Sequence, residues 1–125
     1  MARERKVLGS EGEAEAARYL KKRGLKIIER NYRSRLGEID LVAQDGKRWV
    51  FVEVKTRIEA DGDPPQSAVT PLKQQRLARL AQEYIARGRL GDVPCRFDVV
   101  SVLFDSATRI KEIRHLENAF DATGW

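Results

Sequence analysis

The sequence predicts an α/β or α+β domain with one mixed sheet and helices over its faces. Segments 10–23 and 70–87 have the apolar period of helices, whereas five other segments have strand character. The strand segments form a group of three and then a pair, so the order is helix, three strands, helix, two strands. A chain of 125 residues predicts one domain, residues 1–125, with one core.

Each predicted helix has a start signal and a stop signal. We expect the first helix to begin after Ser10 and to end near Arg23, where Gly24 supplies a left-handed stop. The second is capped by Thr70, opened by Pro71 and extends to about residue 87, with Gly88 after it. A polar loop with Asp-Gly and Pro-Pro pairs, residues 57–71, precedes it.

The strands are predicted from alternating or β-rich segments. "LKIIERNY" (25–32) suits a short strand, and "GEIDLVA" (37–43) with "WVFVEVKT" (49–56) suits a hairpin around Asp45-Gly46. "RFDVVSVLF" (96–104) and "RIKEIRHL" (109–116) predict the last pair. We expect Asp98 in the first of these to be structural, paired with Arg96 or with an adjacent loop, and His115 to be a surface or packing residue rather than a catalyst.

Composition restricts the function. The net charge is +5, and basic residues outnumber acidic ones in segments 1–36 and 71–90, which indicates a nucleic-acid partner or a solvated basic face. One histidine and one cysteine exclude zinc sites built from several such ligands. No apolar run approaches a membrane span, no signal peptide is visible and no internal disulfide can form, so we expect a cytoplasmic protein without membrane contact.

The predicted hairpin places charged residues on one face. Alternation puts Val50, Val52 and Val54 on one side of the strand and Trp49, Phe51, Glu53 and Lys55 on the other. If the two-residue loop is Asp45-Gly46, Asp40 faces Phe51 and Glu38 faces Glu53. Asp40 then lies diagonal to Glu53, about 7–8 Å away, within reach of one bound ion.

Glu13 has two interpretations. It lies three, four and seven residues before Ala16, Ala17 and Leu20, so it belongs to the apolar face of the first helix and points toward the sheet. Alternatively, Ser10 and Glu13 form a capping box, in which Glu13 bonds back to the backbone of Ser10.

Carboxylates gathered on one sheet face repel one another, and a divalent cation would offset this repulsion. Oxygen ligands without His or Cys suit Mg²⁺ or Mn²⁺. The chemistry that fits is phosphodiester hydrolysis, with the acids holding the cation and Lys55 orienting water or stabilising charge on the phosphate. The alternative is a solvated strand face on which Lys55 pairs with Glu53.

This constellation resembles the PD-(D/E)xK nuclease superfamily, which implies a restriction endonuclease-like α/β fold of order αβββαββ. Asp40, Glu53 and Lys55 match the motif, although Ile39 stands where the motif has proline; Glu13 resembles the helix acid of archaeal Holliday junction resolvases. The chain is also similar, over nearly its whole length, to the YraN family of predicted endonucleases. The stretches that carry this similarity are "GSEGE", "RNYR", "GEIDLVA", "FVEVKTR", "AVTPLKQ", "RFDVV" and "NAF".

The resemblance implies Asp40, Glu53, Lys55 and Glu13 as catalytic residues, with the three acids as metal ligands. DNA is the expected partner. Five basic and polar residues flank the site and are candidates to hold the DNA; the alternative for each is a solvent-exposed side chain without a specific contact. They are Arg33, Arg35, Arg57, Lys73 and Gln74. The first functional interpretation is a metal-dependent DNA endonuclease for branched or damaged DNA. A nucleic-acid-binding module that does not cleave and a protein-interaction domain are the alternatives. Resolvases act as dimers, so a homodimer is a further expectation.

Overall fold

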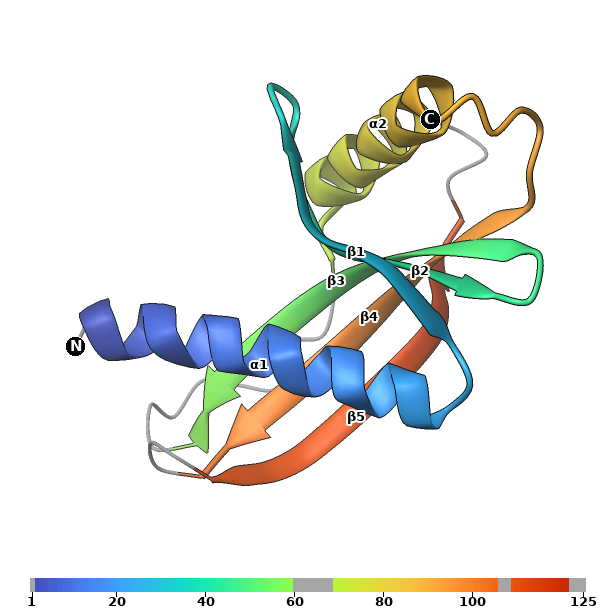
Figure 1. Cartoon of the computed structure of the whole chain (residues 1–125). Coiled ribbons are helices and arrows are strands. Elements are labelled where there is room, and N and C mark those ends of the chain that lie inside the picture. The colour runs from blue at the N-terminus through green and yellow to red at the C-terminus, as the bar shows by residue number, and fades with distance from the viewer. Residues whose placement is uncertain (1, 60–68, 106–108, 122–125) are drawn as a thin grey trace.

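The computed structural model describes residues 2–59, 69–105 and 109–121 (Figure 1). Two helices and five strands follow in the predicted order αβββαββ: α1 (Ala2–Lys22), β1 (Lys26–Ser34), β2 (Gly37–Asp45), β3 (Arg48–Ile58), α2 (Pro71–Arg87), β4 (Cys95–Phe104) and β5 (Ile110–Phe120). The predicted loop at 57–71 lies largely outside the described residues, and its first two positions belong to β3.

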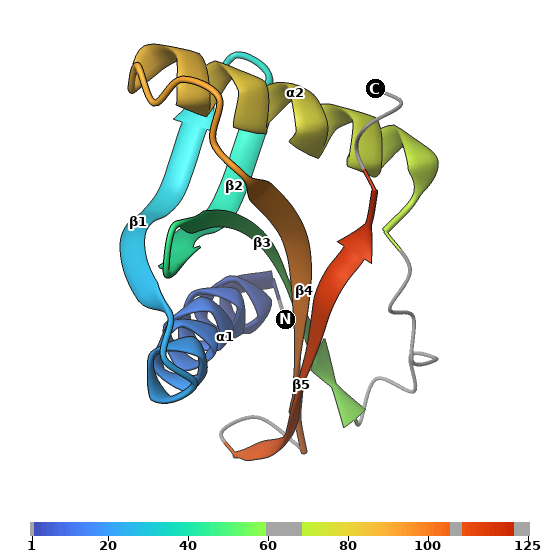
Figure 2. The same cartoon turned by 90° about the vertical axis from the view of Figure 1, so that its right-hand side faces the viewer.

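The five strands form one mixed sheet in the order β1-β2-β3-β4-β5. Only β3 and β4 are parallel, and α2 lies in the connection between them; the other neighbours are antiparallel. Figures 1 and 2 show α1 beside one side of the sheet and α2 across another part of it. This is the restriction endonuclease-like α/β arrangement that the resemblance implied.

Each helix covers its own core. Leu20 of α1 packs with Val50 and Val52 on one face, here called the α1 face, and Leu77 of α2 packs with Phe51 on the other, the α2 face. The predicted alternation along β3 is therefore confirmed. Neither helix, within the part of the chain that the structure describes, combines the length and apolar character needed to cross a membrane.

The predicted start of α2 and the predicted end of α1 are confirmed, whereas the predicted start of α1 is not. Thr70 caps α2 by accepting a hydrogen bond from Lys73 N, and Gly24 after α1 has a positive φ of 95°, as expected. The predicted start of α1 is wrong, because α1 begins at Ala2 and Ser10 lies inside it. The Ala, Arg, Glu and Lys residues before Ser10 are good helix formers, so the helix continues through Gly9 and Ser10. Ser10 is therefore no N-cap, and the capping-box interpretation of Glu13 is wrong.

The register of the β2–β3 hairpin differs from the predicted one by two residues. Asp45 pairs with Arg48, so the loop is Gly46-Lys47, and Leu41 pairs with Val52. Gly46 has a positive φ of 63° at the first loop position, where two-residue hairpins favour glycine. The predicted pairs Asp40–Phe51 and Glu38–Glu53 are wrong. A shift of two keeps every side chain on its predicted face, because the side-chain period of a strand is two.

A bend in the β1–β2 ribbon separates β2 from β3 at Asp40. Ile39 belongs to the core under α2, whereas Leu41 belongs to the core under α1, although alternate residues of a strand normally share a face. Asn31 lies in β1 at the same level and has a positive φ of 56°. Figure 1 shows the ribbon turning from the sheet toward α2. The bend places Asp40 at the fork between β2 and β3.

Gly12 allows α1 to pack closely against β3. A Cβ at this position would lie 2.3 Å from Thr56 Oγ1, so the helix or the strand would have to move. We expect Gly12→Ala to destabilise the fold by about 1–3 kcal/mol, although Gly→Ala normally stabilises a helix interior. Urea unfolding of Gly12→Ala, Thr56→Ala and the double variant measures the coupling between the two positions.

Gly9→Ala is the matched control, because a Cβ at Gly9 would meet nothing within 4 Å. This variant should gain about 0.5–1 kcal/mol. Equal effects of the Gly9 and Gly12 substitutions, or additive effects in the double variant, would contradict the close approach of α1 to Thr56.

Candidate active site

Asp40 is held at the fork by a hydrogen bond from the backbone of β3. Its Oδ2 accepts from Val54 N at 2.8 Å. The bend of β2 leaves this N–H without a strand partner, and the carboxylate takes that place. Burial, together with the negative charges of Glu53, Glu13 and Glu38, raises the pKa of Asp40 to about 7. Asp40 is therefore a carboxyl group whose charged form needs compensation.

Glu53 follows on the α2 face of β3 and binds two lysines through one oxygen. Its Oε2 lies 3.0 Å from Lys73 Nζ and 3.5 Å from Lys55 Nζ, and its side chain is 13% exposed. Burial and the neighbouring Lys73 ammonium lower the pKa of Lys55, against the opposing attraction of Glu53. The predicted Glu53–Lys55 pair is thus present, and Lys73 joins it from the first turn of α2.

Asp40 and Glu53 line one hollow under α2. It has a volume of about 210 Å³, and its polar lining also includes Glu38, Lys73 and Arg76. Gly37, Leu77 and Leu80 complete its wall. The structure thus places the predicted pair of carboxylates and Lys73 together, whereas Lys55 lies beside this group through Glu53 and Glu13 is not part of the lining.

Glu13 extends from α1 toward the bent ribbon instead. With the Asn31 amide oriented to donate, its Nδ2 lies 2.9 Å from Glu13 Oε1 and 2.9 Å from Glu38 Oε2. Burial and the charge of Glu38 raise the pKa of Glu13. Asn31 thus links the two acids. Sequence reasoning did not identify it, because the left-handed position that aims its side chain cannot be seen in the sequence.

The carboxylate oxygens of Asp40 and Glu53 are ligands that a hard cation prefers, but the side chains of the site do not surround a common ion position. Among the residues that the structure describes, no three His, Cys, Asp or Glu side chains converge on a common point. Asp40 and Glu53 offer only oxygen ligands in one hollow, and burial and the neighbouring carboxylates both raise the pKa of Asp40. These two residues fit Mg²⁺ or Mn²⁺ with water as the remaining ligands, provided that Glu53 Oε2 exchanges Lys73 for the ion.

The residues predicted to contact DNA differ in their surroundings. Arg33 is exposed and donates to Glu38 Oε2 at 2.9 Å, and Arg35 is exposed in the turn after β1. Arg57 is half-buried, and its Nε has no hydrogen-bond partner among the residues that the structure describes. Gln74 donates from Nε2 to the Val69 carbonyl at 2.9 Å, so its amide supports the entry to α2. Whether these residues bind DNA stays a prediction.

Asp98 and His115 belong to a buried hydrogen-bond network outside the candidate site, which agrees with the structural role expected for Asp98 and the packing role considered for His115. Asp98 is 1% exposed and accepts from Arg96 Nε at 3.0 Å and from Asn118 N at 2.9 Å, while His115 Nε2 lies 2.8 Å from its Oδ2. Arg96 Nη1 also donates to Asp45 Oδ2 at 3.0 Å. The network ties β4 to β5 and to the β2–β3 turn. Although burial acts to raise it, the pKa of Asp98 is lowered by its hydrogen bonds with His115, Arg96 and Asn118.

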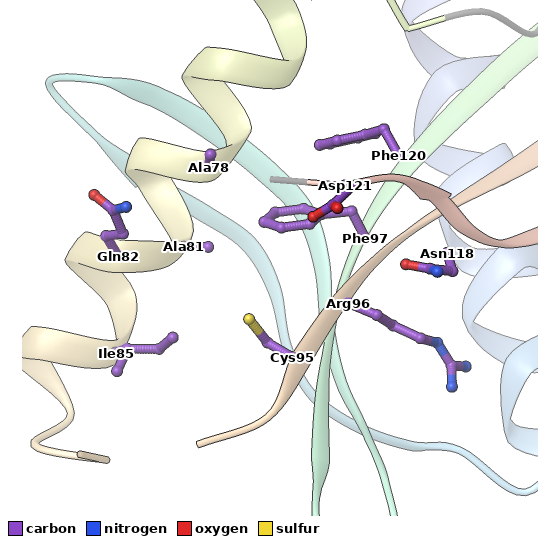
Figure 3. Close-up of a pocket in the computed structure, with 10 residues that line it drawn as sticks. All are labelled: Ala78, Ala81, Gln82, Ile85, Cys95, Arg96, Phe97, Asn118, Phe120 and Asp121. Atoms are coloured by element: carbon purple, nitrogen blue, oxygen red, sulfur yellow. The ribbon is translucent and has the colours of Figure 1, made fainter. Parts of the chain in front are cut away.

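A second hollow lies between α2 and the strands β4 and β5. It has a volume of about 220 Å³ and an apolar wall that includes Ala81, Ile85, Phe97 and Phe120. Figure 3 shows Phe97 directed toward α2 and Arg96 directed away from this hollow. None of the predicted site residues lines it, so the charged hollow at Asp40 and Glu53 is the candidate active site.

The raised pKa of Asp40 predicts a stability that depends on pH. An unfolded Asp titrates near 3.9, so between about pH 4 and 7 the folded chain holds a proton that the unfolded chain lacks. Stability should fall as pH rises through this window, by about 2–4 kcal/mol in total. Asp40→Asn keeps an acceptor for Val54 N–H without the charge, so it should be more stable than wild type at pH 8.

Urea unfolding at pH 5, 6.5 and 8 in EDTA measures this difference. Asp92→Asn, at an exposed position before β4, is the control and should follow the wild-type profile. Parallel profiles for wild type and Asp40→Asn would contradict the strained state of Asp40.

The fold and the hollow together define a class: a restriction endonuclease-like α/β protein with two carboxylates and two lysines at the fork of its central strands. The chain belongs to the uncharacterised protein family UPF0102, whose model matches residues 12–102. This membership confirms the resemblance to the YraN family, and the family description carries no activity.

Curated relatives match over nearly their whole length. The UPF0102 protein of Pelotomaculum thermopropionicum is 49% identical over 121 residues, which cover 96% of this chain and 100% of the relative. That of Geotalea uraniireducens is 47% identical, with coverage of 93% and 91%. UPF0102 protein STH1475 of Symbiobacterium thermophilum is 51% identical, with coverage of 92% and 97%.

Proposed function

We propose that this chain is a divalent-metal-dependent DNA endonuclease that hydrolyses phosphodiester bonds, with branched or damaged DNA as substrate. The observation that carries the proposal is the shared hollow of Asp40 and Glu53, in which burial, together with three neighbouring carboxylates, raises the pKa of the half-buried Asp40. Perturbed carboxylates in a hollow are typical of functional sites. The chemistry that compensates them is a cation.

Asp40 and Glu53 would hold Mg²⁺ or Mn²⁺ through their oxygens. The bound ion would polarise the phosphate and lower the pKa of an attacking water. Asp40 is fixed for this role by Val54 N–H at its other oxygen. Glu13 is the weaker ligand candidate, because its carboxyl is engaged by Asn31 and does not line the hollow.

Lys55 would act on the water and on the phosphate. Its lowered pKa means that its Nζ loses a proton more readily than an exposed lysine does, so it can accept the proton of the water. In its charged form it would stabilise negative charge that develops on the phosphate. Its contact with Glu53, at 3.5 Å, keeps it next to the proposed cation site.

The alternative is a nucleic-acid-binding module of the same fold that does not cleave DNA. One observation favours it: Lys73 and Lys55 already form ion pairs with Glu53, so the charge of this carboxylate is compensated without a metal ion. The basic segments would then bind DNA phosphates without chemistry. A homodimer, the state in which resolvases act, stays a prediction for either function.

A panel of DNA substrates tests the proposal. Linear, flapped and four-way substrates are incubated with the full chain and Mg²⁺, Mn²⁺ or EDTA, beside Glu53→Gln as the matched inactive variant. We expect metal-dependent cleavage of at least one branched substrate by wild type and none by Glu53→Gln. DNA binding without cleavage of any substrate would favour the non-cleaving module, and the absence of both DNA and metal binding would favour a protein-interaction domain.

A further inference from the structure

Arg76 lies on α2 one turn after Lys73 and lines the same hollow as Asp40 and Glu53. Its stem passes over Gly37 at the start of β2, where an added Cβ would lie 3.3 Å from Arg76 Cδ. The absence of a side chain at Gly37 therefore leaves room for this stem. The residue is exposed, so its guanidinium is accessible to a ligand in solvent.

The basic side chains around the hollow differ in their partners. Lys73 and Lys55 both contact Glu53 Oε2, and Arg33 is paired with Glu38. In contrast, no acidic side chain of the described segments forms an ion pair with Arg76. Among the residues that the structure describes, Arg76 is therefore a cation at this hollow that no ion pair engages.

We propose that Arg76 is the phosphate-binding residue of this hollow and that it binds a phosphodiester of nucleic acid through its guanidinium. A guanidinium presents paired donors that match two phosphate oxygens, which an ammonium cannot do. Lys73 and Gln74, which are also expected from the sequence to contact DNA, have side chains engaged by Glu53 and by the Val69 carbonyl, respectively. The inference rests on the proposed function, because it places the phosphate beside the proposed cation.

The contribution of Arg76 should depend on a divalent cation. Asp40, Glu53 and Glu38 also line the hollow, and their negative charges repel a phosphate. A cation bound by Asp40 and Glu53 would remove this repulsion and bring the phosphate within reach of Arg76. An arginine on an ordinary basic surface would bind DNA equally well with or without the cation.

The test compares DNA affinities with and without Ca²⁺, which supports binding without requiring cleavage. A fluorescein-labelled four-way junction is titrated with wild type, Arg76→Gln, Arg76→Lys and Arg79→Gln, in EDTA and in Ca²⁺ at one salt concentration. Arg79 is the matched control, because it is an exposed arginine on the same helix and does not line the hollow. Thermal melting establishes that each variant is folded.

In Ca²⁺, Arg76→Gln should bind about 10- to 100-fold more weakly than wild type, the range for hydrogen bonds to charged groups. In EDTA its loss should match that of Arg79→Gln, and Arg76→Lys should recover part of the affinity in Ca²⁺. An equal loss for Arg76→Gln in EDTA and Ca²⁺, or no effect of Ca²⁺ on wild type, would overturn the proposal. Metal-dependent cleavage together with such a result would refute the role of Arg76 but retain the nuclease function.

Discussion

Lys55→Ala is expected to lower the rate of DNA cleavage by about 10²- to 10³-fold, the usual effect of removing one group that acts in the transition state. DNA affinity should change little, because Lys55 is one charge among 24 Lys and Arg residues. Its Nζ is engaged by Glu53 and its side chain is 26% exposed, so it offers little surface to a DNA backbone. Single-turnover cleavage and equilibrium binding, measured on the same substrate, separate the two effects.

Lys55→Arg distinguishes the two roles of this residue. Arginine keeps the positive charge but does not release a proton near neutral pH. If Lys55 accepts a proton, Lys55→Arg should be almost as slow as Lys55→Ala; if it only stabilises charge, Lys55→Arg should retain much of the activity. Cleavage at the wild-type rate by Lys55→Ala would remove this lysine from the mechanism.

Asp98→Ala is expected to cost about 3–5 kcal/mol of folding stability, because it leaves the buried Arg96 without its main counter-ion. The substitution also removes the acceptor of Asn118 N–H, at a position where the register between β4 and β5 shifts. For a chain of this length, such a loss corresponds to a fall of roughly 10 °C or more in melting temperature. Urea unfolding at pH 7 provides the direct measurement.

Asp45→Asn is the matched control for this prediction. Asp45 also pairs with Arg96, but its side chain is 48% exposed, and exposed pairs contribute little. We expect its effect to remain below about 1 kcal/mol. A similar small effect for Asp98→Ala would mean that the buried network does not hold the strands together.

The sequence predicted the order of elements because each carries a local signal. Thr70-Pro71 starts α2, Gly24 ends α1, and alternation marks the strands. The start of α1 was missed, since Gly9 and Ser10 look like a helix boundary whereas the preceding residues are helix formers. The observed hairpin loop lies one residue further along the chain than the predicted loop, because Asp45-Gly46 and Gly46-Lys47 both suit a two-residue turn. This displacement shifts the pairing register by two residues.

The candidate site was predicted in part, for a physical reason. Asp40 and Glu53 share the hollow because a register error of two residues preserves the face of each side chain. The positions of Asn31 and Arg76 depend on the bend in the β1–β2 ribbon and on the packing of α2 over Gly37, which join residues far apart in the chain. Strand alternation contains no information on either contact.

The central claim is that Asp40 and Glu53 share one divalent cation, and Mn²⁺ binding tests it most directly. Electron paramagnetic resonance measures free Mn²⁺ during titration of the full chain at pH 8, where Asp40 is mostly ionised because its pKa is about 7. We expect one bound ion in wild type and in the control Asp92→Asn, and a loss of binding in Asp40→Asn and in Glu53→Gln. Thermal melting at 100 times the dissociation constant should show a stabilisation of about 2.7 kcal/mol in the same two proteins that bind. Equal Mn²⁺ binding by wild type and both site variants would contradict the claim, because the two carboxylates would then not hold the ion.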